Sequence, residues 1–116
     1  MVCIAFGGLI GWAASTFAYT RSQPLIPQFE NREVKVWKTI LAPHENLGMH
    51  RHEHGRVVVA LNGGTLSIPQ EKGGSRKLDL KTGQAYWLAA DPPGELHGDL
   101  NESNKPIEMM VIELQR

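Results

Sequence analysis

The sequence predicts an all-β protein built as an antiparallel sandwich or barrel. From Glu33 onward the apolar runs are short and strand-like, and stretches rich in Gly, Pro, Asn and Asp separate them. We find eight or nine such runs and no convincing helix in this part of the chain. Repeated turns at this spacing are typical of closed or double-layered antiparallel sheets.

Three strands are predicted in the first half of the folded part, and the last two flank a sequence typical of a tight turn. VKVWKTIL (34–41) alternates apolar and polar residues, as a half-buried strand does. RVVVALNGG (56–64) is β-branched and ends in Asn-Gly-Gly, and TLSI (65–68) follows at once. We therefore predict a hairpin over residues 57–68.

Polar turns separate the later strands. These turns are QEKGGS, TGQ and DPPGE, and Pro106 opens the last strand. The strands between them are RKLDLK (76–81), AYWLAA (85–90) and IEMMVIEL (107–114). The outward faces of RVVVAL and IEMMVIEL are also apolar, which favours either a second sheet or a partner subunit over them. We expect a homodimer.

Residues 1–18 differ from the rest of the chain. The first twenty residues carry no charge, and their apolar run is shorter than the about twenty residues of a membrane span. We predict a secretory signal peptide cleaved after Ala18, and hence a secreted or periplasmic protein. The alternative is an uncleaved membrane anchor within residues 1–20. Residues 19–33 are predicted to be an extended linker, and residues 34–116 the folded domain.

Charge and cysteine content exclude several classes of function. The chain has 12 Lys and Arg against 12 Asp and Glu, without a basic cluster, so we do not expect a nucleic acid as partner. The one cysteine, Cys3, lies in the segment that cleavage would remove. The mature protein would then have neither a disulfide nor thiolate chemistry.

Histidines are concentrated at one place in the sequence, HRHEHGR (50–56). Side chains two residues apart share one face of a strand, so His50 and His52 can point together into the mouth of a barrel. Three imidazoles on an apolar face would be a poor choice for a core, since each has two ring nitrogens to satisfy. We expect His54 and Glu53 to belong to the following turn. A fifth histidine, His97, follows a Pro-Gly turn far along the chain.

These two segments together resemble the two sequence motifs of the cupin family. The positions that match the first motif are His50, His52 and Gly63. The positions that match the second motif are Gly83, Pro92, Gly94, His97 and Asn101, with three extra residues after Gly83. The resemblance covers about residues 34–114. It implies a single antiparallel jelly-roll β-barrel with a divalent metal inside, held by the motif histidines and a glutamate.

The chain departs from the cupin pattern at two positions. His44 stands at the first glycine of motif one, and Arg56 stands where the family has its glutamate ligand. Arginine stays protonated in proteins. At about 5 Å from a divalent cation its repulsion would reach roughly 7 kcal/mol at an effective dielectric constant near 20, before screening or an added anion offsets it.

Three accounts of Arg56 remain open from the sequence. In the first, His50, His52 and His97 hold Fe, Ni, Mn, Cu or Zn, and Arg56 swings toward the mouth and binds an anionic substrate. In the second, another group supplies the carboxylate. Glu95, two residues before His97, is the candidate, with His54 a further candidate ligand. In the third there is no metal, and Arg56 itself occupies the site.

The resemblance favours a function for the site without identifying a reaction, because one fold hosts many functions. Our first expectation is a metal-binding cupin with oxygenase- or isomerase-like activity on a small anionic molecule. The alternative is a non-catalytic module that binds a small ligand, in which Arg56 replaces the metal-ligand glutamate. The sequence has no assured general base, so catalytic residues are not assigned and enzymatic activity stays undecided. A purely structural role would leave the histidines unexplained.

Overall fold

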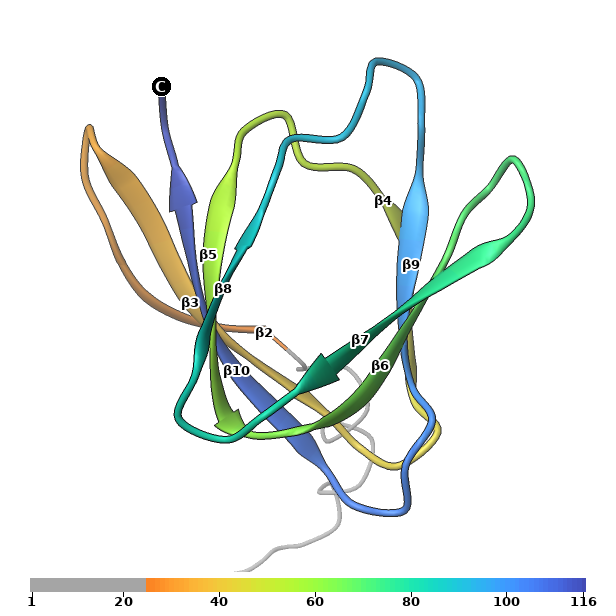
Figure 1. The fold of residues 1–116 in the computed structure, drawn as a ribbon. Coiled ribbons are helices and arrows are strands. Elements are labelled where there is room, and N and C mark those ends of the chain that lie inside the picture. Colours follow the sequence, from red (N-terminus) through yellow and green to blue (C-terminus); the bar gives the residue numbers. More distant parts are fainter. Residues whose placement is uncertain (1–24) are drawn as a thin grey trace, which may run out of the picture.

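The computed structural model describes residues 25–116, which form nine strands in two antiparallel sheets (Figure 1). In chain order the strands are β2 (Leu25–Glu30), β3 (Val34–Leu41), β4 (Asn46–His50), β5 (Arg56–Asn62), β6 (Gly64–Pro69), β7 (Ser75–Leu80), β8 (Ala85–Leu88), β9 (His97–Asn101) and β10 (Ile107–Leu114). The prediction of an all-β jelly-roll barrel is confirmed. The predicted signal peptide or membrane anchor lies outside the described residues.

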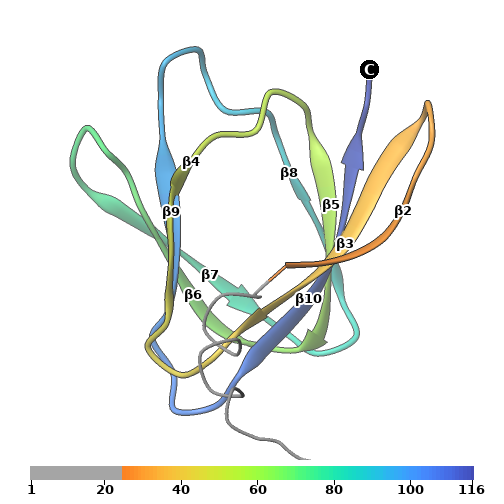
Figure 2. The same ribbon diagram turned by 180° about the vertical axis from the view of Figure 1, so that it is seen from behind.

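One sheet has the order β2-β3-β10-β5-β8 and the other the order β4-β9-β6-β7. Views from the front and from behind show the two sheets on opposite sides of a common interior (Figures 1 and 2). Within the described residues, no helix is long and apolar enough to cross a membrane.

The core lies between the sheets and follows the two-residue period of the strands. In β5, Arg56, Val58 and Ala60 are buried, while Val57 and Val59 are only partly covered. β10 alternates in the same way. The buried cluster consists of Leu41, Val58, Ala60, Leu66, Ile68, Leu80, Ile107, Met109 and Val111. Because Arg56 has the same parity as Val58, its side chain starts toward the interior.

The predicted hairpin over residues 57–68 is wrong. β5 pairs with β10 and β8, whereas β6 pairs with β9 and β7, so the two strands belong to different sheets. The chain changes sheets at Gly63 and Gly64. A Cβ on Gly63 would lie 2.1 Å from the carbonyl oxygen of Leu80, so only glycine fits beside that backbone. Asn-Gly-Gly therefore marks a corner of the barrel and not a tight hairpin turn.

The predicted linker contributes a strand to the barrel. Residues 25–30 form β2, which pairs antiparallel with β3. The folded part of the chain thus begins by Leu25, earlier than the predicted boundary at residue 34. Every residue of β2 is exposed, which explains why no alternation of apolar and polar residues marked it in the sequence.

Candidate metal centre

Three histidines meet on the inner side of the smaller sheet. His50 ends β4 and His97 begins β9, and the two are partners in the β4–β9 pairing. Ligand atoms of His50, His52 and His97 all lie within 4.8 Å of one another. The ring centroids are 4.6 Å apart for His50 and His97 and 5.0 Å apart for His50 and His52. The structure therefore brings together the three residues that the sequence picked as metal ligands.

His52 reaches this cluster by a different route from the one expected. β4 ends at His50, so the strand period does not align the two side chains. Asp91 holds His52 instead: its carboxylate Oδ2 accepts from the His52 backbone N–H at 2.7 Å, and its own N–H donates to the His52 carbonyl at 2.9 Å. The loop after β4 is thus fixed to the loop before β9.

Each histidine has an acceptor oxygen within 3.1 Å of its Nδ1 atom. The Glu113 carboxylate lies 3.1 Å from Nδ1 of His52, and the Asp91 carboxylate lies 3.1 Å from Nδ1 of His97. The Gly48 carbonyl lies 2.7 Å from Nδ1 of His50. Because carbonyls and carboxylates only accept, these contacts favour a ring hydrogen on Nδ1. At His50 the Asp99 carboxylate also lies 3.3 Å from Nε2, and this contact raises the pKa of the ring.

The donor set fits a metal that binds imidazole nitrogen. Nε2 of His97 is buried without any hydrogen-bond partner, a costly arrangement unless something binds it. Carboxylate or carbonyl partners on the far nitrogen are the usual support of metal-bound histidines. Burial lowers the pKa of His97 and also that of His52, where the charge of Arg56 adds to the effect. Both rings therefore favour the neutral form that a metal requires.

Arg56 lies in the site and does not swing out toward solvent. Its side chain is buried, and Nη1 donates to the Ala89 carbonyl at 3.4 Å. Burial lowers the pKa of the guanidinium, and the nearby charges of Asp91, Asp99 and Glu113 counteract this. The charges of three carboxylates thus act on one guanidinium, against the opposing charge of Arg76. These negative charges reduce the repulsion that Arg56 would exert on a cation.

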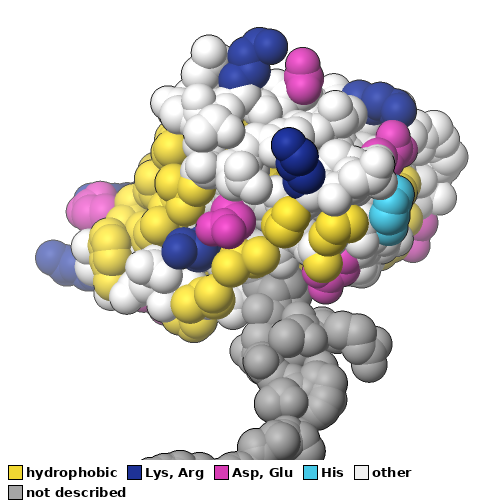
Figure 3. Space-filling model, turned by 90° about the horizontal axis from the view of Figure 1, so that it is seen from below, with side chains coloured by type: hydrophobic (Ala, Val, Ile, Leu, Met, Phe, Trp, Pro, Cys, Tyr) yellow, Lys and Arg dark blue, Asp and Glu magenta, His cyan; other side chains and the backbone are white. Residues whose placement is uncertain are grey.

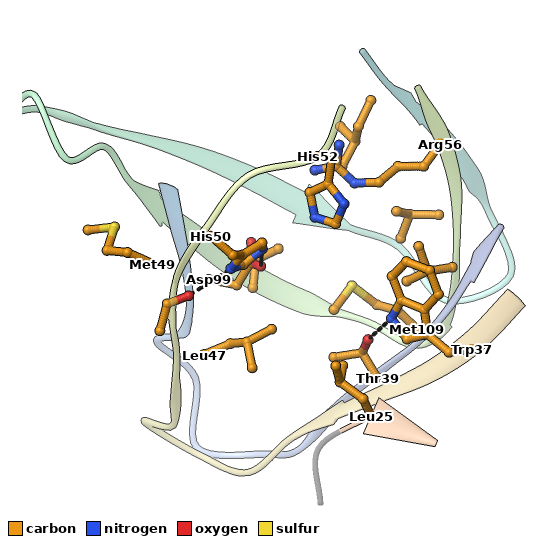
Figure 4. A pocket seen from close by; sticks show the side chains of 15 residues that line it. Leu25, Trp37, Thr39, Leu47, Met49, His50, His52, Arg56, Asp99 and Met109 are labelled. Carbon is orange, nitrogen blue, oxygen red and sulfur yellow. Dashed lines mark hydrogen bonds and ion pairs between the residues drawn. The ribbon is translucent and has the colours of Figure 1, made fainter. Parts of the chain in front are cut away.

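A cavity of about 370 Å³ opens beside the histidines (Figure 4). His50, His52, Arg56 and Asp99 supply polar groups to its wall. Most of the remaining lining is apolar: Leu25, Trp37, Leu47, Met49, Val58, Leu66, Leu88, Met109 and Val111. Few polar groups in a mostly apolar wall are typical of a site for a small molecule.

The other candidate ligands lie outside the histidine cluster. Glu95 precedes β9, and its backbone N–H closes the turn by donating to the Pro92 carbonyl at 3.1 Å. The strand that would have aligned it with His97 begins only at His97 itself. His54 lies between β4 and β5, as expected, and does not belong to the cluster.

Sequence reasoning missed the three carboxylates around the histidines. Asp99 lies two residues after His97 on the same strand, so strand parity could have found it. Strand parity could not have identified Asp91, because Asp91 lies in the loop before β9 and not on a strand. Glu113 depends on the register of β10, which places it opposite Arg56. Its role therefore could not be inferred from local sequence.

Comparisons with known proteins agree with the fold. No family model matches the chain. The β-alanine degradation protein BauB of Pseudomonas aeruginosa is 36% identical over 88 residues, which cover 76% of this chain and 88% of that protein. A cupin domain from Bordetella pertussis Tohama I superposes with a TM-score of 0.68 at 30% identity, covering 79% of this chain and 94% of that one. A protein with a double-stranded β-helix domain from Klebsiella pneumoniae, 20% identical, gives a TM-score of 0.60 over 80% of this chain and 78% of its own, and supports the fold alone.

Proposed function

We propose that this chain, which belongs to the cupin superfamily, binds a divalent metal through His50, His52 and His97 and a small organic anion beside Arg56. The observation that carries the proposal is the shared orientation of the rings. All three have Nδ1 engaged by an acceptor, and the Nε2 atom of His97 is buried without a partner. A cation bound by Nε2 would satisfy these atoms together.

Three neutral imidazoles suit Fe, Ni, Cu or Zn, and Mn is a further candidate. Such a metal would polarise an oxygen of a bound molecule or activate a small co-substrate. The protein's own contribution is to hold the rings, to exclude bulk water and to orient the ligand. Arg56 suits a carboxylate because its planar guanidinium can form two parallel hydrogen bonds.

The cavity narrows the choice of ligand to a small molecule with an apolar part. Its volume of about 370 Å³ is at the low end of ligand sites, and its wall is largely hydrocarbon. The name of the Pseudomonas relative refers to β-alanine degradation, and β-alanine carries a carboxylate. We therefore propose β-alanine and other short-chain carboxylic acids as the first ligands to test.

The metal proposal is tested by elemental analysis of protein purified without a histidine tag. We expect about one metal per chain. We expect His97→Ala to abolish metal uptake while the circular dichroism spectrum of the sheet is retained. A wild-type protein that contains no metal and takes up none of Fe, Ni, Mn, Cu or Zn would contradict the proposal.

The activity is a separate question from binding. We propose oxygenase- or isomerase-like chemistry on the bound acid, with a non-catalytic binding module as the second candidate. The observation that favours the second candidate is that Asp91 and Glu113 are engaged by histidine Nδ1 atoms and are not free to act as a base. Oxygen consumption by the metal-loaded protein with a panel of short-chain acids separates the two, since a binding module retains the acid without turnover.

We further propose that residues 1–18 direct export, with an anchor within residues 1–20 as the alternative.

A further inference from the structure

Asp99 occupies a position that the supporting role of the other carboxylates does not explain. Glu113 and Asp91 meet Nδ1 of their histidines, on the side away from the proposed metal. Asp99 instead places Oδ2 3.3 Å from Nε2 of His50, on the side where a metal would bind (Figure 4). It is the carboxylate of the three that lines the cavity beside His50.

The contact between His50 and Asp99 lacks a donor in the neutral ring. The Gly48 carbonyl accepts from Nδ1 at 2.7 Å, so the ring hydrogen resides there. A proton on Nε2 lets the ring donate to Asp99, and this contact is the main reason why the pKa of His50 is raised. In the neutral ring Nε2 presents a lone pair to the carboxylate oxygen, and a metal ion that takes the place of the proton would accept electron pairs from both atoms.

The separation of the two atoms fits a pair of ligands on one metal. Nitrogen and oxygen ligands lie about 2.0–2.2 Å from a first-row metal such as zinc, so two of them at 90–110° are about 3.0–3.5 Å apart. The observed 3.3 Å falls in this range. The Asp99 side chain also borders open cavity, so it has room to turn toward the centre.

We propose that Asp99 is the carboxylate ligand of this metal centre, in place of the family glutamate that Arg56 replaces here. The proposal rests on the proposed function, since it requires the three histidines to bind a metal. In the structure the Asp99 carboxylate contacts His50 alone among them, and rotation of its side chain toward the other two completes the coordination. Asp99 would then supply the negative charge on the metal that the family takes from its glutamate. Arg56, at the glutamate position, would be free to bind the small organic anion.

The first test compares Co²⁺ binding by the wild type and by Asp99→Asn, using competition with a chelating dye. Asparagine preserves the shape of the side chain and removes its charge. We expect affinity to fall at least about 100-fold, because even supporting residues cost 10–100-fold when they are changed. Asp79→Asn, which alters an exposed carboxylate on β7, is the matched control and should leave affinity unchanged.

The second test distinguishes a ligand from a residue that only positions His50. Asp99→Cys in a Cys3→Ser background places one thiol in the chain, at position 99. A thiolate bound to Co²⁺ gives an intense charge-transfer band in the near ultraviolet, which an unbound thiol does not. Appearance of this band on adding Co²⁺ supports the proposal.

The outcomes separate the two proposals. If the wild type binds Co²⁺, and Asp99→Asn binds it equally well or Asp99→Cys binds it without the band, the role of Asp99 is overturned while the three-histidine site stands. If the wild type binds no metal, the proposed function fails and the role of Asp99 fails with it. Thermal unfolding of each variant shows whether a loss of affinity comes from a loss of fold.

Discussion

A single carboxylate oxygen of Asp91 contacts two of the three histidine segments. Oδ2 accepts from the backbone N–H of His52 and lies 3.1 Å from Nδ1 of His97. It therefore sets both the position of the loop after β4 and the tautomer of His97. Asp91 is in this sense a positioning residue and does not itself face the metal.

We expect Asp91→Asn to weaken metal binding by about 10–100-fold, because the amide is a poorer acceptor and can present its NH₂ group to His97. Metal affinity measured by dye competition checks this, and the sheet should remain folded. Glu95→Gln is the control, since Glu95 lies outside the cluster. Equal affinities of wild type and Asp91→Asn would mean that the loop keeps its place without this contact.

The positive charge of Arg56 lies beside the proposed metal and opposes it. We expect Arg56→Glu to bind metal more tightly, because a positive charge beside the cation is replaced by a negative one. Binding of short-chain acids to the metal-loaded protein should weaken in the same variant. Isothermal titration with each partner measures both effects, and Lys105→Gln, which removes an exposed charge between β9 and β10, is the control. Unchanged metal affinity would show that Arg56 exerts no effect on the centre.

Among the elements, the corner between β5 and β6 depends on one glycine. A Cβ on Gly63 would lie 2.1 Å from the carbonyl oxygen of Leu80 and 3.0 Å from the backbone nitrogen of Thr82. Backbone cannot move aside as a flexible side chain does. The turn between β7 and β8 would have to shift, and with it the edge of both sheets.

We expect Gly63→Ala to destabilise the protein by at least about 2 kcal/mol, equal to roughly 10 °C in Tm for a domain of this size. Differential scanning calorimetry measures the change. Gly48→Ala is the matched control, because a Cβ there would meet nothing within 4 Å. Similar melting temperatures for the two variants would contradict a steric requirement at Gly63.

The backbone conformation of His44 bears on the other departure from the cupin pattern, the absence of the first glycine of motif one. His44 stands where the family has glycine, and its φ is 62°, in the left-handed region that favours glycine. The turn between β3 and β4 therefore keeps its shape with a side chain present. A backbone hydrogen bond from His44 to Asn101 (2.8 Å) holds it in place.

The sequence predicted the strands better than their pairing. Alternation identified β3 and β10 with their observed bounds. The alternating burial of β5 explains why Arg56 faces inward. The partner of β6 could not be found locally, because Asn-Gly-Gly fits a tight turn as well as a corner. The histidines could be grouped from motif spacing, whereas Glu113 entered the site only through the register of β10 against β5.

For the whole molecule, the edge strand β2 is an exposed apolar surface. It forms one edge of the larger sheet and exposes Leu25, Ile26 and Phe29. Hydrophobic side chains gather on the side of the molecule that holds β2 and β3 (Figure 3). An exposed apolar edge strand in a stable protein is usually covered. We propose a homodimer in which β2 contributes to the interface.

We expect Phe29→Glu to shift the protein from dimer to monomer, because Phe29 is 57% exposed in the single chain and a charge opposes its burial in an interface. Size-exclusion chromatography with light scattering gives the mass. Leu61→Glu, at an exposed apolar residue outside β2, should leave the dimer intact. A monomeric wild type, or a Phe29→Glu variant that stays dimeric, would contradict the β2 interface.

The fluorescence of Trp37 offers a way to follow metal binding at the site. Its indole stacks on His52 with ring centroids 6.4 Å apart and an interplanar angle of 7°, and Nε1 is fixed by Thr39 Oγ1 at 3.0 Å. A paramagnetic ion bound at Nε2 of His52 would sit close enough to quench the indole emission. Loading can therefore be followed in the unlabelled protein, in real time and at low concentration. The same stacked pair would report any movement of the loop that carries His52.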